Sequence, residues 1–369
     1  MEDRSAASVG VVLAGFALAA AAFPWGTVGV GPVENVVLAV LGTAAVGAFA
    51  LRRHDLLARG SGSIVAGVAS FGVVGYVGVA TAGTLAGGSR LVVETPTHSP
   101  WGVALAFVGG VGGVIAAYGD GRGLPESLGQ AAKEIAWSLT VGFAGLFAIA
   151  AWGSVLLGLL TEFLPGEPGT ASQLVVGAIA LGFGTGTVAL VYFQMSDKTL
   201  AYLDFRLPDA RDVGYIVAGV VALFGLQAVV AVVFSQLGIS TAEHSVQQTA
   251  SGGNADVLLL LIPASWLIIG PGEELLYRNI IQKSLYGTFG EWGAVLVGSV
   301  VFALAHIPAY AGGADLGGLL STLVVIFFLS LVLGASYLKT DNVTVSAVIH
   351  GTFDAIIFAA MYVQMSGGV

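Results

Sequence analysis

The sequence predicts an all-α fold, a polytopic bundle of transmembrane helices. Of its 369 residues, 56% are hydrophobic and only 9% are charged, and the mean hydropathy is +0.91. These values exceed those of a soluble domain and are typical of membrane proteins. The chain has no cysteine, which excludes disulfides, thiolate catalysis and cysteine-ligated zinc.

Eleven apolar runs have about the 20 residues that a helix needs to cross a bilayer. The first run follows MEDRSAASVG, whose two acids and downstream spans favour a retained helix over a cleaved signal peptide. Glycine and alanine recur within the runs, and small residues let membrane helices approach closely. The predicted spans are 7–23, 33–51, 64–86, 101–118, 135–160, 172–195, 214–236, 257–286, 290–308, 318–338 and 343–364.

The lysines and arginines predict the orientation. If the N-terminus lies inside, twelve of the 13 basic residues fall at or toward the cytoplasm, and only Arg90 falls outside. This distribution is what the positive-inside rule expects of a correct span count. We therefore predict a cytoplasmic N-terminus and an external C-terminus in the cell membrane. The acid excess, with a net charge of −9, lies mainly in loops such as DFRLPDARD and suits the cytoplasm of a halophilic organism.

The ionisable residues inside spans are concentrated near the C-terminus. Glu273, Glu274 and Asp354 are the acids well inside spans, and His306 and His350 are the two histidines within helices. Ionisable groups in hydrocarbon are costly unless they are paired or face a polar cavity, so their default interpretation is functional. The first seven spans show no comparable cluster in the sequence, which disfavours a transporter built from two inverted repeats.

The spacing of these residues predicts contacts. Glu274 and Arg278 are four residues apart and share one helix face, as do His350 and Asp354. A rise of ~1.5 Å per residue places Glu273 ~20 Å and His306 ~21 Å from the cytoplasmic ends of their helices. The same rise places Asp354 ~16 Å and His350 ~11 Å from the cytoplasmic end of their helix. All four depths are smaller than the ~30 Å thickness of the hydrocarbon layer. The polar groups of three helices therefore predict one cavity inside the membrane.

Three motifs resemble those of a known family. EELLYR (273–278), FALAH (302–306) and HGTFD (350–354) look like the EExxxR, FxxxH and Hxxx(N/D) motifs of the CAAX-processing and bacteriocin-processing (CPBP) family of intramembrane proteases, which includes the Rce1-like prenyl-protein endopeptidases. The resemblance implies a protease core over 131–369, with the motifs in 256–364, after an N-terminal extension over 1–130. It implies a catalytic set of Glu273, Glu274, Arg278, His306, His350 and Asp354, supported by Phe302.

Peptide hydrolysis assigns roles to this set. It needs a base for water, stabilisation of the oxyanion and a proton donor for the leaving amine. Glu273 would be the base, because desolvation in a low-dielectric site raises the affinity of a carboxylate for a proton. Glu274 would pair with Arg278, His306 would share the water, and His350 would polarise the carbonyl. Asp354 replaces the family's frequent asparagine, and it could donate a hydrogen bond only when protonated.

The sequence is compatible with a zinc site and with a metal-free site. Glu273, His306 and His350 could together bind a catalytic zinc ion. An H-E-x-x-H motif is absent, and a water activated by glutamate and histidine needs no ion. We therefore expect no cofactor, with zinc as the alternative.

The same residues allow other interpretations. The two glutamates follow Pro-Gly and could be first-turn acids of a helix. Arg278 could be an interfacial anchor, His306 a packing histidine at a helix end, and Phe302 a packing residue. For the whole chain, the alternatives are a proton-coupled transporter and a non-proteolytic immunity or scaffold protein. The expected partners are the lipid bilayer and a membrane-tethered peptide or protein substrate, and no nucleic acid is expected.

Overall fold

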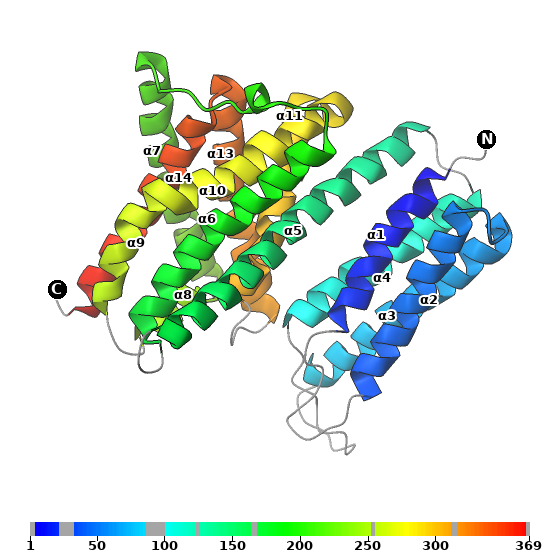
Figure 1. The fold of residues 1–369 in the computed structure, drawn as a ribbon. Helices are drawn as coiled ribbons and strands as arrows, with labels where there is room; N and C mark the ends of the chain where they lie inside the picture. The colour runs from blue at the N-terminus through cyan, green and yellow to red at the C-terminus, as the bar shows by residue number, and fades with distance from the viewer. Residues whose placement is uncertain are drawn as a thin grey trace. The chain divides into compact units, whose positions relative to one another are not determined.

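A computed structural model describes residues 4–21, 33–85, 100–122, 126–163, 168–251, 255–310 and 316–366. Within these ranges the chain is helical or connecting, so the predicted all-α fold is confirmed (Figure 1). The first half of the chain comprises α1 (Ser5–Ala20), α2 (Val33–Arg53), α3 (Arg59–Leu85), α4 (Pro100–Arg122), α5 (Glu126–Phe163), α6 (Thr170–Met195), η1 (Leu200–Tyr202) and α7 (Ala210–Leu237). The second half comprises α8 (Ser245–Ser251), η2 (Ala255–Val257), α9 (Leu258–Ala264), η3 (Ser265–Ile269), α10 (Gly270–Glu274), η4 (Leu275–Gln282), α11 (Lys283–Ala305), α12 (Ile307–Tyr310), α13 (Leu316–Thr340) and α14 (Val343–Met365).

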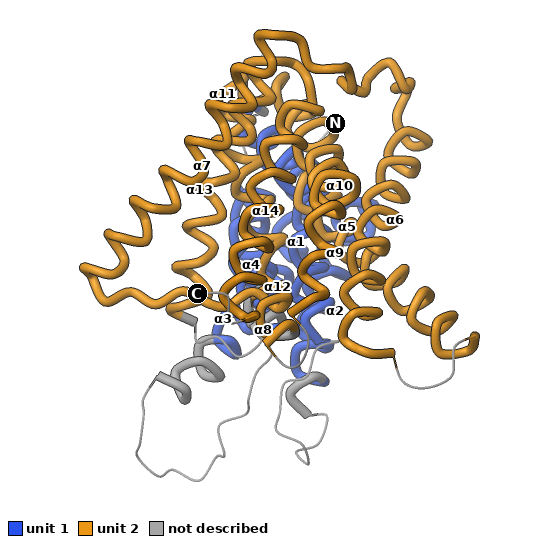
Figure 2. Tube along the Cα trace, turned by 90° about the vertical axis from the view of Figure 1, so that its left-hand side faces the viewer, with its two compact units in different colours: residues 1–137 blue, residues 138–369 orange. Residues whose placement is uncertain are grey.

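The chain divides into two compact units, residues 1–137 and 138–369 (Figure 2). The division falls inside the long helix α5. The boundary at residue 130, which the sequence suggested for the protease core, falls inside the same helix.

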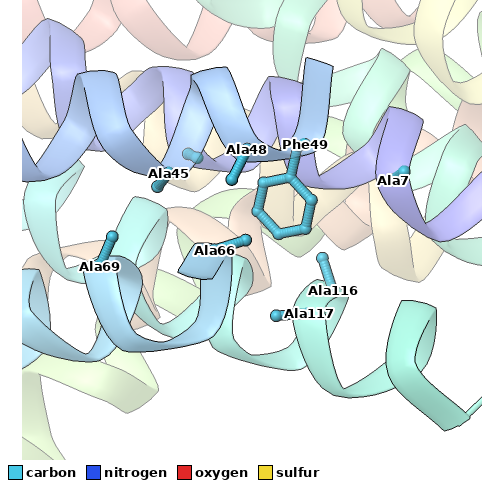
Figure 3. Packing of buried hydrophobic residues seen from close by; sticks show 9 residues of the cluster. Ala7, Ala45, Ala48, Phe49, Ala66, Ala69, Ala116 and Ala117 are labelled. Carbon is cyan, nitrogen blue, oxygen red and sulfur yellow. The ribbon is translucent and has the colours of Figure 1, made fainter. Parts of the chain in front are cut away.

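Unit 1 is a bundle of α1 to α4 packed through small side chains. Phe49 is 1% exposed and is surrounded by alanines of the neighbouring helices (Figure 3). The cluster comprises Ala7, Ala14, Ala45, Ala48, Phe49, Ala66, Ala69, Ala116 and Ala117. Such small residues allow close backbone approach, which is how helices associate where lipid supplies no hydrophobic drive.

Unit 1 also contains buried charges that the sequence did not reveal. Arg52 and Asp120 are almost fully buried and form an ion pair, with 3.2 Å between Arg52 Nε and Asp120 Oδ2. Arg59 Nε donates to the carbonyl oxygen of Asp120. Arg52, Arg59 and Asp120 lie just outside the predicted spans 33–51, 64–86 and 101–118, so they do not contradict the absence of an ionisable cluster within those spans. These groups lie at helix ends, which hydropathy windows assign to loops.

Unit 2 carries the helices of the C-terminal motifs, and one long helical path in it is irregular. Residues 258–282 run through α9, a π-helical turn (η3), α10 and a second π-helical stretch (η4). Pro263 lies inside α9, where it removes one backbone hydrogen bond. Gly290 has φ 66° and ψ 178°, so it breaks the run that begins as α11. π-Helical turns of this kind are frequent at functional sites.

Eight helical segments of the described chain are long and apolar enough to cross a membrane. One of them, Ala255–Ala305, has 51 residues and includes the break at Gly290. The chain is thus a multi-pass membrane protein. The count of eleven spans and the N-inside orientation stay predictions.

Candidate active site

The paired glutamates lie at the end of the short helix α10, and their arginine partner follows in η4. Successive residues of a helix point about 100° apart, so the two neighbours face different surroundings. The Glu274 side chain is 0% exposed, whereas that of Glu273 is 14% exposed.

Two glycines bring this helix against α14. A Cβ atom at Gly270 would lie 2.6 Å from the carbonyl oxygen of Ala347, and one at Gly351 would lie 2.5 Å from that of Ser265. Only glycine allows backbones to come this close. Gly351 follows His350 directly, so this close contact places His350 beside the two glutamates.

Glu274 connects two of the predicted residues. Arg278 Nε donates to Glu274 Oε2 over 2.9 Å, the pair that the spacing predicted, and both side chains are 0% exposed. The other oxygen, Oε1, lies 3.1 Å from His350 Nδ1. A carboxylate only accepts, so Nδ1 carries the proton. Glu274 therefore fixes the ring of His350 and directs Nε2 away from itself.

His306 is oriented by its own helix. Its Nδ1 lies 2.8 Å from the carbonyl oxygen of Phe302, one turn earlier. Nδ1 must donate in this bond, so in the neutral ring Nε2 is left as an acceptor.

Glu273 faces both histidines without bonding to either. Its Oε2 lies 3.8 Å from His306 Nε2 and 3.9 Å from His350 Nε2. Within the described residues, this oxygen is buried and has no hydrogen-bond partner. These distances are too long for direct hydrogen bonds. They are short enough that a single water oxygen could lie within hydrogen-bond distance of Glu273 and either histidine.

Asp354 lies beside the same histidine. Its Oδ2 is 3.5 Å from His350 Nε2, one turn away on α14. The Asp354 side chain is 23% exposed, so it lies at the accessible side of the group.

Phe302 contacts three of the predicted residues, and Tyr277 as well. Its ring centroid lies 4.4 Å from that of His306, 5.9 Å from that of His350 and 4.9 Å from that of Tyr277. The guanidinium carbon of Arg278 lies 4.9 Å from the same centroid, within the range of a cation–π contact. Phe302 therefore packs against both histidines and against the guanidinium of Arg278. The structure brings all seven predicted residues together.

A carboxylate that was not predicted from the sequence holds the same helices together. Asp204 Oδ2 accepts from Lys283 Nζ at 2.7 Å, Tyr337 Oη at 2.5 Å and Asn279 Nδ2 at 3.1 Å. The carbonyl oxygen of Asp204 accepts from the backbone of Val343 at 3.0 Å. It thus ties η4, α13 and the start of α14 together. The sequence signal that points to this contact is Asn279, an amide directly after Arg278 inside the predicted span 257–286.

Asp212, in the first turn of α7, belongs to a second clamp. It is 1% exposed, and its Oδ2 lies 2.6 Å from Arg206 Nη1 and 3.1 Å from Asn342 Nδ2. Asn342 in turn caps α14, because its side-chain oxygen accepts from the backbone of Thr344. The acids of DFRLPDARD are therefore not only solubilising surface charges.

His244 is a further missed residue. Its Nδ1 accepts from the backbone N–H of Val246 at 3.0 Å, and its ring stands edge-on to Tyr310, with centroids 4.8 Å apart. Burial, and to a smaller extent the ring of His306, lowers the pKa of His244 to about 4. His244 is therefore neutral at pH 7.

An apolar groove lies behind the glutamates. It has a volume of about 340 Å³ and runs between α6 and the 267–275 segment. Gly272 and Leu275 belong to its lining, and none of the predicted site residues does.

Residues 255–356 match the family model described as type II CAAX prenyl endopeptidase Rce1-like. The chain carries an Rce1-like domain. All seven predicted site residues fall inside it, and unit 1 lies outside it. No curated protein and no solved structure matched the chain. The Rce1-like family consists of type II CAAX prenyl endopeptidases, which are peptidases.

The geometry of the site also bears on metal binding. Among the residues that the structure describes, no group of three or more histidine and acidic side chains is arranged to hold an ion. The side chains that would bind an ion are Glu273, His306 and His350, and their separations are those given above.

Proposed function

We propose that the Rce1-like domain hydrolyses a peptide bond of a membrane-associated peptide or protein with a water molecule activated by Glu273 and His306. The observation that carries this proposal is the gap between Glu273 Oε2 and the two Nε2 atoms, 3.8 Å and 3.9 Å. One water there would contact a free carboxylate oxygen and an acceptor nitrogen, and both can take its proton.

The attack follows from this placement. Glu273 removes a proton from the water, and the oxygen adds to the carbonyl carbon of the peptide. The resulting oxyanion needs a donor within about 3 Å. His350, when its ring carries a second proton, offers Nε2–H on the side where Glu273 lies. The proton held by Glu273 then passes to the leaving nitrogen, and the C–N bond breaks.

The remaining polar groups hold His350 in place. Glu274 bonds Nδ1 and is itself bonded by Arg278, an arrangement in which a carboxylate fixes the orientation of a catalytic imidazole. Asp354 lies 3.5 Å from Nε2 and would keep that nitrogen protonated until the oxyanion forms. This role needs a carboxylate, in contrast to the asparagine that is frequent in the family's motif.

The site needs no metal ion in this mechanism. A test of that proposal is exhaustive chelation of purified protein, followed by elemental analysis of wild type and His306→Ala. We expect activity to survive chelation, and His306→Ala to lose activity without a change in bound metal. Stoichiometric zinc that leaves together with activity would replace the glutamate mechanism by a zinc mechanism.

The proposed peptidase activity can be measured with quenched-fluorescent peptides in lipid vesicles. Two peptides that differ only in a C-terminal isoprenyl group should be compared, so that the assay also measures the contribution of prenylation. Glu273→Gln should abolish turnover, while the exposed control Glu291→Gln on α11 should retain it. Equal turnover by wild type and Glu273→Gln would contradict the role of Glu273, whereas no turnover by wild type would favour a non-proteolytic role.

A further inference from the structure

Arg278 has hydrogen-bonding capacity that its ion pair does not use. A guanidinium carries five N–H groups, and the bond to Glu274 involves only Nε. Nη1 and Nη2 are buried, and within the described chain they have no hydrogen-bond partner. Buried donors in native proteins are nearly always paired, with protein or with ordered water.

Four neighbouring side chains share this property. Each has one buried side-chain atom that finds no hydrogen-bond partner within the described residues. These atoms are Gln282 Oε1 and Asn279 Oδ1 on η4, Ser299 Oγ on α11 and Ser330 Oγ on α13. All four side chains belong to residues that are 0% exposed.

Gly334 shows that these helices converge at one place. A Cβ atom built there would lie 2.8 Å from Gln282 Oε1, 3.0 Å from Val295 Cγ1 and 3.7 Å from Arg278 Nη1. The Gln282 oxygen and the Arg278 nitrogen are therefore near one point, beside a residue that has no side chain.

The two serines lie on the helix faces that meet there. Ser330 is one turn before Gly334 on α13 and shares its face. Ser299 is four residues after Val295, which contacts the Gly334 position, and three before Phe302, which lies against Arg278. Three helices thus direct polar atoms without partners toward one region behind the ion pair.

We propose that this region, formed by Arg278, Gln282, Ser299, Ser330 and Gly334, is a site for ordered water molecules. The donors come from Arg278, the acceptor from Gln282, and the hydroxyls can act as either, which suits water. An inorganic anion suits the site less well, because Glu274 already neutralises Arg278 and the Gln282 oxygen would face the anion.

The water site has a consequence for catalysis, which rests on the proposed function. Water on Nη1 and Nη2 would fix the position of the Arg278 guanidinium. The guanidinium binds Glu274, and Glu274 in turn accepts from His350 Nδ1. Ser299 and Ser330 are then positioning residues. Losing one hydroxyl should lower kcat and leave KM unchanged, because neither serine is placed to touch the substrate.

The first test is direct and does not depend on activity. An experimental structure at a resolution that shows solvent should place water within hydrogen-bond distance of Arg278 Nη1 or Nη2 and of Gln282 Oε1. A second structure of protein soaked in bromide would reveal an anion instead. A dry region, or bromide at these atoms, would overturn the proposal.

The second test uses variants on α13. Ser330→Ala should lower kcat about 10- to 100-fold with KM unchanged, and Ser330→Thr, which restores the hydroxyl, should recover most of it. Ser336→Ala is the matched control, because Ser336 Oγ already donates to the carbonyl of Val332. Equal kcat in Ser330→Ala and Ser336→Ala would overturn the positioning role.

The two tests separate the two proposals. If wild type cleaves none of the peptides, the proposed function fails, while the solvent structure still decides the water site. If wild type is active and the site is dry, the water site fails and the proposed function stands.

Discussion

Removing Arg278 should cost much more stability than removing the charge of Glu273. In Arg278→Ala, Glu274 would stay 0% exposed and lose its 2.9 Å partner. Breaking a buried ion pair in this way costs about 3–5 kcal/mol. His350 Nδ1, at 3.1 Å from Glu274, still compensates part of the charge. We therefore expect a loss near the lower end of that range.

Glu273→Gln should behave differently. The amide has the shape of the carboxylate, and Glu273 Oε2 gives up no hydrogen bond to the described residues. A loss of less than about 1 kcal/mol is expected, together with complete loss of turnover. The two glutamates would thus be separated by two measurements, stability and activity.

Thermal unfolding in one detergent and at one scan rate measures the difference. For a unit of this size, a loss of about 3 kcal/mol lowers the midpoint by roughly 6–12 °C. The double variant Glu274→Gln/Arg278→Met removes both charges and should recover much of that loss. Similar midpoints for Glu273→Gln and Arg278→Ala would refute the separate roles.

Four further outcomes are expected. Gly351→Ala should lower stability and activity together, because its Cβ would meet the Ser265 carbonyl at 2.5 Å; an unchanged midpoint would contradict the close packing. Asp204→Asn should cost about 1.5–3 kcal/mol, and the exposed control Asp197→Asn almost nothing, in the same unfolding assay. With the pKa of His244 lowered to about 4, the unfolded state takes up its proton first, so stability falls by up to about 3 kcal/mol as pH drops from 6.5 to 4. His244→Phe should lose less midpoint over that pH range than wild type, and an equal loss would contradict the assignment. Reporter fusions after residues 60 and 369 should read inside and outside, and an inside signal at the second would exclude the eleven-span topology.

The parts of the site that could be predicted from sequence are those set by local spacing and by the cost of burial. Arg278 lies four residues after Glu274, and a helix makes that pair adjacent whatever surrounds it. His306 and His350 could be associated with the glutamates because ionisable groups in hydrocarbon must find one another. Neither argument needs the tertiary structure.

The parts that could not be predicted depend on contacts between distant segments. Asp204 lies in a polar loop and looks like a surface acid, yet it accepts from residues on η4 and α13. Asp120 sits two residues from the end of α4 and is paired with Arg52. For both aspartates, a partner far along the chain decides the environment.

The adjacent glutamates explain why the motif needs two acids where a single base performs the chemistry. A base must have a free oxygen that water can reach, and Glu273 has one, with 14% of its side chain exposed. A carboxylate that orients His350 must keep its charge and position, and Glu274 does so by full burial against Arg278. One carboxylate cannot meet both conditions, because the bonds that fix it would occupy the oxygen that must accept the proton. Consecutive positions on a helix provide both environments, since one residue turns toward the histidines and the next toward the arginine. Exchanging Glu273 for aspartate should therefore shift the base away from the water and reduce kcat, whereas Glu274→Asp should loosen the ion pair and reduce stability as well; equal effects on both properties would contradict this division.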